Sequence, residues 1–122
     1  MSGQIVVGYS SRPEGRAALR RALTEATLRD ARLIVLHGPE DDLDELRADL
    51  GAAGVAYELR AATADGDVAE DLIELAEDTG AAFIVIGLRR RSPVGKLLLG
   101  SNAQRVLLDA SCPVLAVKAE QA

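Results

Sequence analysis

The sequence predicts an α/β fold, a three-layer α/β/α domain built on a five-stranded parallel sheet. Its 122 residues suit a single domain that spans residues 1–122. Short apolar runs alternate with longer amphipathic segments, which is typical of repeated β-α-β units. The apolar run at residues 4–9 is continuous rather than alternating, and this indicates a strand that is buried on both faces.

The expected strands and helices alternate along the whole chain. Short apolar runs predict strands at residues 4–9, 32–37, 55–63, 82–87 and 113–118. Apolar residues recur at helical spacing in the segments between them, which predicts helices at residues 13–29, 41–53, 68–79 and 101–110. The pairs Ser11–Glu14 and Asp67–Glu70 have the spacing of capping boxes, so each is expected to start a helix.

The order of the strands follows from their burial. Strands 4–9 and 82–87 are the most uniformly apolar, so they belong in the middle of the sheet. With right-handed crossovers this favours the order 3-2-1-4-5. Ligands of open α/β sheets bind beyond the carboxyl ends of the strands where the order reverses. The segments Gly8–Arg12 and Gly87–Ser101 are expected to meet at that crevice.

Charge and composition exclude several classes of protein. The net charge of −5 argues against general binding of nucleic acid, which needs an excess of Lys and Arg. No apolar run approaches the length of a membrane span, and one cysteine suits a reducing compartment, so we expect a cytoplasmic protein. The acidic run at residues 40–49 is expected to be a solvated helix face. His37, the only histidine, is expected to be packed or hydrogen-bonded at its strand end rather than to bind a metal.

The loop between the fourth strand and the fourth helix carries the candidate chemistry. Gly100 would let a ligand approach the backbone, and Ser101 is expected to cap the helix, with Gln104 three residues on. The N–H groups at such a helix start bind anions. Arg89 and Arg90 leave the strand at the same crevice, so the sequence predicts a phosphate site. An ordinary capping motif that needs no ligand remains the alternative.

This loop resembles the nucleotide-binding signature of the universal stress protein family. That signature is a Gly, two residues, a second Gly, nine residues, and then Gly-Ser or Gly-Thr. Here the first glycine is Gly87 and the closing pair is Gly100–Ser101, whereas Arg90 stands at the second glycine. Five other segments also look like the family, at residues 5–9, 31–37, 66–87, 104–107 and 112–118.

The resemblance implies an adenine nucleotide alpha hydrolase-like fold and a bound ATP or AMP. Ser10 stands where the family's nucleotide-binding members carry an Asp, and Gly38 stands where a Val is usual. Arg90 could either close the phosphate pocket or add a donor to it. The expected nucleotide-binding residues are Gly8, Ser10, Gly38, Gly87, Arg89, Arg90, Gly100, Ser101 and Asn102.

Three functions remain open at this point. The first is a stress-response protein that binds ATP or AMP, and the second is a nucleotide-free interaction protein of the same fold. An ATPase is the weakest, since no carboxylate is placed to hold magnesium; at most weak hydrolysis is expected, with no catalytic residue and no metal. The strand at residues 113–118 lies at a sheet edge and is apolar on both faces, which predicts a two-fold homodimer through this strand. The family resemblance implies the same dimer.

Overall fold

The computed structural model describes residues 3–63, 67–89 and 99–119. Its five parallel strands have the order β3-β2-β1-β4-β5, which confirms the predicted fold class and sheet order. The strands are β1 (Gln4–Gly8), β2 (Arg32–His37), β3 (Tyr57–Ala61), β4 (Phe83–Leu88) and β5 (Val114–Lys118). The helices are α1 (Pro13–Arg29), α2 (Leu43–Ala53), α3 (Val68–Thr79) and α4 (Ser101–Asp109).

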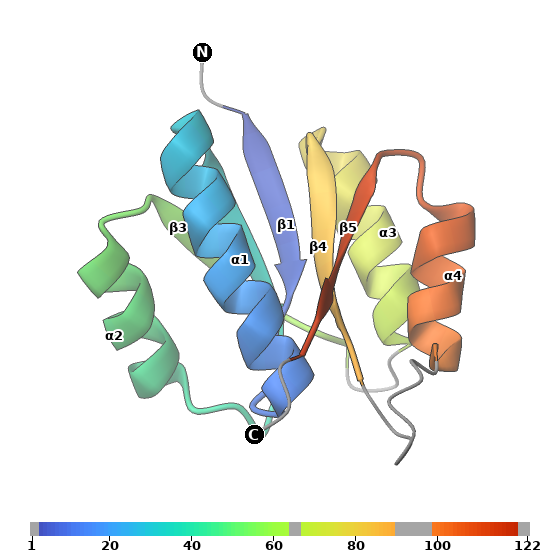
Figure 1. Ribbon diagram of the computed structural model, residues 1–122, viewed down its shortest axis with the longest axis horizontal. Coiled ribbons are helices and arrows are strands. Elements are labelled where there is room, and N and C mark those ends of the chain that lie inside the picture. Colours follow the sequence, from blue (N-terminus) through green and yellow to red (C-terminus); the bar gives the residue numbers. More distant parts are fainter. Residues whose placement is uncertain (1–2, 64–66, 90–98, 120–122) are drawn as a thin grey trace.

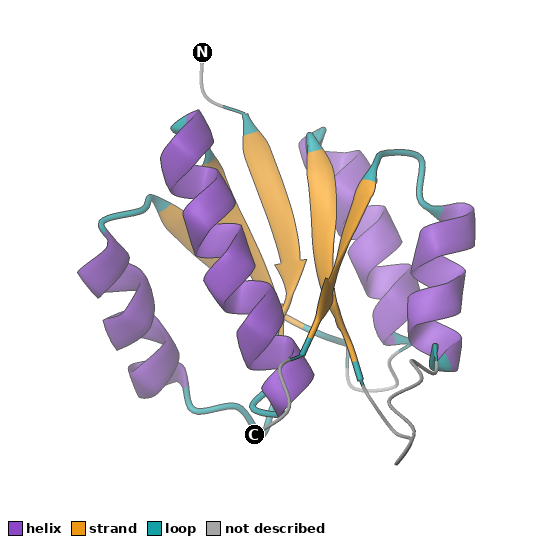
Figure 2. Cartoon of the chain, viewed as in Figure 1, coloured by secondary structure: helices purple, strands orange, loops and turns teal. Residues whose placement is uncertain are grey.

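The helices cover the two faces of the sheet in pairs, with α1 and α2 on one face and α3 and α4 on the other (Figure 1). Alternate side chains of the central strands therefore enter two separate cores. Ile5 and Val7 of β1 pack with α1 and α2, whereas Val6 packs with α3 and α4. All three side chains are fully buried, as the uniformly apolar sequence of β1 predicts. The parallel register brings the carboxyl ends of all five strands to one edge (Figure 2).

Two of the predicted N-caps are wrong, although both helices begin at the predicted residue. Helix α1 begins at Pro13 with Arg12 as its N-cap, so Ser11 and Glu14 form no capping box. Pro13 explains the difference, because proline favours the first helical position, where its missing N–H is not needed. The N-cap of α4 is Gly100 rather than Ser101, and Gln104 instead donates from Nε2 to the Leu99 carbonyl, at 3.4 Å.

The starts of α2 and α3 are capped by carboxylates. Asp67 accepts a hydrogen bond from the Glu70 N–H at 3.2 Å, which confirms the predicted cap of α3. Helix α2 begins two residues later than predicted, since Asp42 caps it by accepting from the N–H groups of Asp44 and Glu45. Asp41 therefore lies outside the helix, in the turn that follows β2.

Two glycines bring the first turn of α1 close to the central strands. A Cβ atom at Gly87, in β4, would lie only 1.9 Å from the carbonyl oxygen of Glu14. A Cβ atom at Gly15 would lie 2.3 Å from both the backbone N and the Oγ of Ser10. Real side chains cannot occupy such positions, so both glycines are required for the close contact of α1 with the ends of β1 and β4.

Candidate functional site

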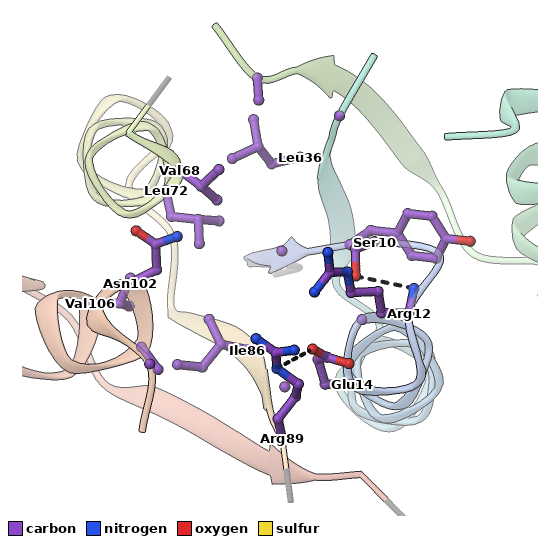
Figure 3. A pocket seen from close by; sticks show the side chains of 18 of the residues that line it. Ser10, Arg12, Glu14, Leu36, Val68, Leu72, Ile86, Arg89, Asn102 and Val106 are labelled. Carbon is purple, nitrogen blue, oxygen red and sulfur yellow. Dashed lines mark hydrogen bonds and ion pairs between the residues drawn. The ribbon is translucent and has the colours of Figure 1, made fainter. Parts of the chain in front are cut away.

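A pocket of about 450 Å³ opens beyond the carboxyl ends of β1 and β4 (Figure 3). It lies where the strand order reverses, as the sequence predicts for this fold. The described part of the chain brings together the predicted site residues Gly8, Ser10, Gly38, Gly87, Arg89, Gly100, Ser101 and Asn102. The ninth predicted residue, Arg90, lies outside the described residues.

One wall of the pocket is aliphatic. The side chains of β2, α3, β4 and α4 gather on one side of the opening in Figure 3. They are Leu36, Val68, Leu72, Ile86 and Val106. A largely apolar lining with a few polar groups is typical of pockets that bind small organic molecules. Sequence reasoning missed these residues, because nothing in their sequence distinguishes them from aliphatic residues of the core.

The N-terminus of α4 supplies hydrogen-bond donors beside the aliphatic wall, with Asn102 next to Val106 and Leu72 in Figure 3. Ser101, Asn102 and Ala103 all line the pocket, and the first backbone N–H that bonds within the helix is that of Gln104, to the Gly100 carbonyl. No described side chain caps this helix, and its first turn contains no acidic residue. The three preceding N–H groups and the helix dipole therefore favour an anion here.

Arg89 lies at the pocket in an ion pair that the sequence did not predict. Its Nε atom is 3.2 Å from Oε2 of Glu14, in the first turn of α1 (Figure 3). Glu14 is the more buried partner, with 17% of its side chain exposed against 46% for Arg89. Arg12 also lines the pocket, and its backbone N–H donates to Oγ of Ser10 at 3.4 Å. Arg12 belongs to the segment Gly8–Arg12 that was expected at this crevice, whereas Glu14 was missed because only the packing of α1 on β4 brings it to this edge.

Asp41 departs from the expected solvated acidic run. Its side chain is buried, and Oδ2 accepts the Gly38 N–H at 2.8 Å, which fixes the turn after β2. Its other oxygen, Oδ1, is buried without a hydrogen-bond partner among the described residues. His37 is also buried and donates from Nδ1 to the Gly38 carbonyl at 3.1 Å, which confirms the expectation of a hydrogen-bonded histidine. Both residues line the same pocket.

Burial also affects Tyr9, which lines the pocket beside Ser10. Desolvation raises the pKa of the Tyr9 phenol above its ordinary value, and the nearby carboxylate of Asp41 raises it further. The guanidinium of Arg16 acts in the opposite direction and lowers the pKa of Tyr9.

Within residues 3–63, 67–89 and 99–119, no three His, Cys, Asp or Glu side chains are grouped as metal ligands would be. In the same ranges no helix is both long enough and apolar enough to cross a membrane.

Comparison with known proteins shows one consistent family. Residues 38–118 match the family model described as the universal stress protein family. A universal stress protein of Mycolicibacterium smegmatis is 42% identical over 126 aligned residues, which cover 93% of this chain and 96% of the relative.

Solved structures give the same result for the fold. A universal stress protein from Archaeoglobus fulgidus is 32% identical, with a TM-score of 0.71 over 97% of this chain and all of that one. A universal stress protein solved in complex with cAMP is 27% identical, with a TM-score of 0.73 over 98% of each chain. Another from Archaeoglobus fulgidus, in complex with dAMP, is 25% identical, with a TM-score of 0.66 over 97% of this chain and 98% of that one. The chain has the adenine nucleotide alpha hydrolase-like fold of these proteins and belongs to the universal stress protein family.

Proposed function

We propose that this chain is a cytoplasmic stress-response protein that binds an adenine nucleotide, ATP or AMP, in the pocket at the ends of β1 and β4. The observation that carries the proposal is the uncapped N-terminus of α4, whose N–H groups line a pocket next to an aliphatic wall. Two family members of the same fold were solved with cAMP and with dAMP, which supports an adenine ligand. At most weak hydrolysis is proposed, with no catalytic residue assigned.

The proposed binding mode divides the pocket in two. The backbone N–H groups of Ser101 and Asn102, with the Ser101 hydroxyl, would hold a phosphate. Gly8, Ser10 and Gly38 would border the base and ribose, opposite the aliphatic wall. Arg89 and Arg90 would neutralise phosphate charge, Arg89 by exchanging Glu14 for the ligand.

Gly100 supports a ligand because no described residue requires a glycine there. Its φ is −69°, which any residue adopts, and a Cβ atom would meet no described atom within 4 Å. Calorimetry of freshly refolded protein with AMP and with ATP tests the proposal. The Gly100→Val variant should lose binding, since its side chain would fill the space before the α4 N–H groups.

Gly51→Val provides a matched control, because Gly51 lies in α2, away from the pocket, and a Cβ atom there would also meet no described atom within 4 Å. It should bind as tightly as the unmodified protein. Absence of heat and of any thermal shift with millimolar nucleotide would contradict the proposed nucleotide binding. Unchanged binding by Gly100→Val would remove the proposed phosphate position. Arg90→Gly separates two roles, because tighter binding would identify Arg90 as an obstruction and weaker binding as a ligand.

We also propose a homodimer through the strand at residues 113–118. The same dimer would suit the alternative function, that of a nucleotide-free interaction protein. Strand β5 is at the sheet edge, and its apolar residues Val114–Val117 are only partly buried. The Pro113 carbonyl and the Ala119 N–H both bond to β4. In a parallel ladder alternate residues face each neighbour, so the Val114 and Ala116 backbone groups point outward.

This geometry gives a selective test of the dimer. Ala116→Pro removes an outward N–H while the bonds to β4 remain, so it should convert the dimer to a folded monomer in sedimentation experiments. Leu115→Pro is the contrasting variant, because it removes a bond to β4 and should lower the free energy of unfolding. A purely monomeric unmodified protein at micromolar concentration would contradict the proposed dimer. Binding of nucleotide by that monomer would leave the nucleotide proposal standing.

A further inference from the structure

We propose that Glu14 is a specificity-determining residue, which makes this pocket favour adenine ligands of low negative charge, such as AMP, over ATP. The inference rests on the proposed function, because it concerns which nucleotide the same pocket accepts. It follows from the position of Glu14, from its ion pair with Arg89, and from the charges of the described residues around the pocket.

The position of Glu14 is fixed by backbone packing. Its carbonyl oxygen lies against Gly87 so closely that a Cβ atom there would be 1.9 Å away. Only 17% of its side chain is exposed, and it lines the pocket from the first turn of α1. An acidic residue is favourable in the first turn of a helix, which suits Glu14 to its position in α1.

Glu14 also engages one of the two arginines that would neutralise phosphate charge. Arg89 points toward Glu14 across the pocket rim in Figure 3, with Nε 3.2 Å from Oε2. A phosphate that took Arg89 from this pair would leave the Glu14 carboxylate partly buried and without its partner. That carboxylate would then face the phosphate charge. Arg89 is therefore a costly counter-charge for a long phosphate chain.

The other charged residues among the described lining of the pocket act in the same direction. Among the described lining residues, Arg12 and Arg89 are cations, whereas Glu14, Glu40 and Asp41 are carboxylates. The N-terminus of α4 accommodates one phosphate, because its first turn contains no acidic residue. Every further phosphate adds negative charge to a pocket in which described carboxylates already outnumber described arginines.

The test is calorimetry with adenosine, AMP and ATP, without magnesium and at low ionic strength, on the unmodified protein and on Glu14→Gln. Glutamine keeps the size of the side chain and an oxygen that accepts from Arg89, but removes the charge. We expect the unmodified protein to bind AMP more tightly than ATP. Glu14→Gln should tighten ATP binding by about tenfold and AMP binding by less, with adenosine unchanged.

Glu77→Gln is the matched control, since it makes the same change of net charge on an exposed residue of α3 outside the pocket. It should leave the ratio of AMP to ATP affinity unaltered. The inference is overturned if Glu14→Gln leaves this ratio unaltered too, or if it changes adenosine binding as much as ATP binding. In either case AMP binding itself would still support the proposed function. Failure of all three ligands to bind would contradict both the proposed function and the proposed role of Glu14.

Discussion

The Gly87→Ala substitution tests whether this glycine of the family signature is required by packing. The new Cβ atom would lie 1.9 Å from the Glu14 carbonyl oxygen and 2.5 Å from its carbonyl carbon. Both are backbone atoms of α1, so no side chain can rotate away and the helix itself must shift. Overpacking of this kind costs about 3 kcal/mol, and replacing glycine recovers about 0.7 kcal/mol through the unfolded chain. We therefore expect a net loss of about 2 kcal/mol in the free energy of unfolding.

Urea unfolding followed by circular dichroism measures this loss. With a slope of about 2 kcal/mol per molar, the midpoint should fall by about 1 M urea. Gly100→Ala, at the other end of the same signature, is the matched control, because its Cβ atom meets no described atom within 4 Å and its φ of −69° suits alanine. Its midpoint should change by less than about 0.5 M. A Gly87→Ala midpoint equal to that of the unmodified protein would refute the packing argument.

Three further predictions concern single side chains. Gly51→Ala should raise the free energy of unfolding by about 0.5–1 kcal/mol in urea experiments, since Gly51 lies inside α2 and a Cβ atom there meets no described atom within 4 Å. Asp67→Ala should lower it by about 1 kcal/mol, whereas Asp67→Asn should keep the cap of α3 and lose only the exposed ion pair with Arg105. In a Tyr57→Phe background, ultraviolet titration should show the Tyr9 phenol ionising above its ordinary pKa of 10.0. Because the pKa of Tyr9 is higher in the folded than in the unfolded state, the neutral phenol contributes to the free energy of unfolding below pH 10. This contribution should be lost as the pH rises through the raised pKa.

The fold could be predicted because the relevant information is local and repeated. Continuous apolar runs marked β1 and β4 as central strands, and the structure buries both on two faces. The predicted order 3-2-1-4-5 puts β3 at an edge of the sheet, where the structure places it. The capping residues were less predictable than the helix starts, because several residues near each start could serve as the cap. Arg12 rather than Ser11 is the N-cap of α1, and Gly100 rather than Ser101 is the N-cap of α4.

The pocket could be predicted in outline, since the ends of β1 and β4 must meet in this sheet order. The acidic residues of the pocket could not be predicted from the sequence. Glu14 reaches the pocket only because α1 packs on Gly87, a contact between residues far apart in the sequence. Asp41 belongs to an acidic run that looks uniformly solvated, yet the turn after β2 buries this one member to accept the Gly38 N–H. Both outcomes depend on tertiary contacts that no local pattern contains.

The two signature glycines that the structure describes differ in what they say about a ligand. Gly87 is required by the Glu14 backbone, so the fold would retain it whether or not a nucleotide binds. Gly100 has no such requirement, because its backbone is extended and the space beside its Cα is empty of described atoms. A residue with a side chain would fit there and would block the N–H groups of α4. Gly100, rather than Gly87, is therefore the glycine of this signature that argues for a bound phosphate.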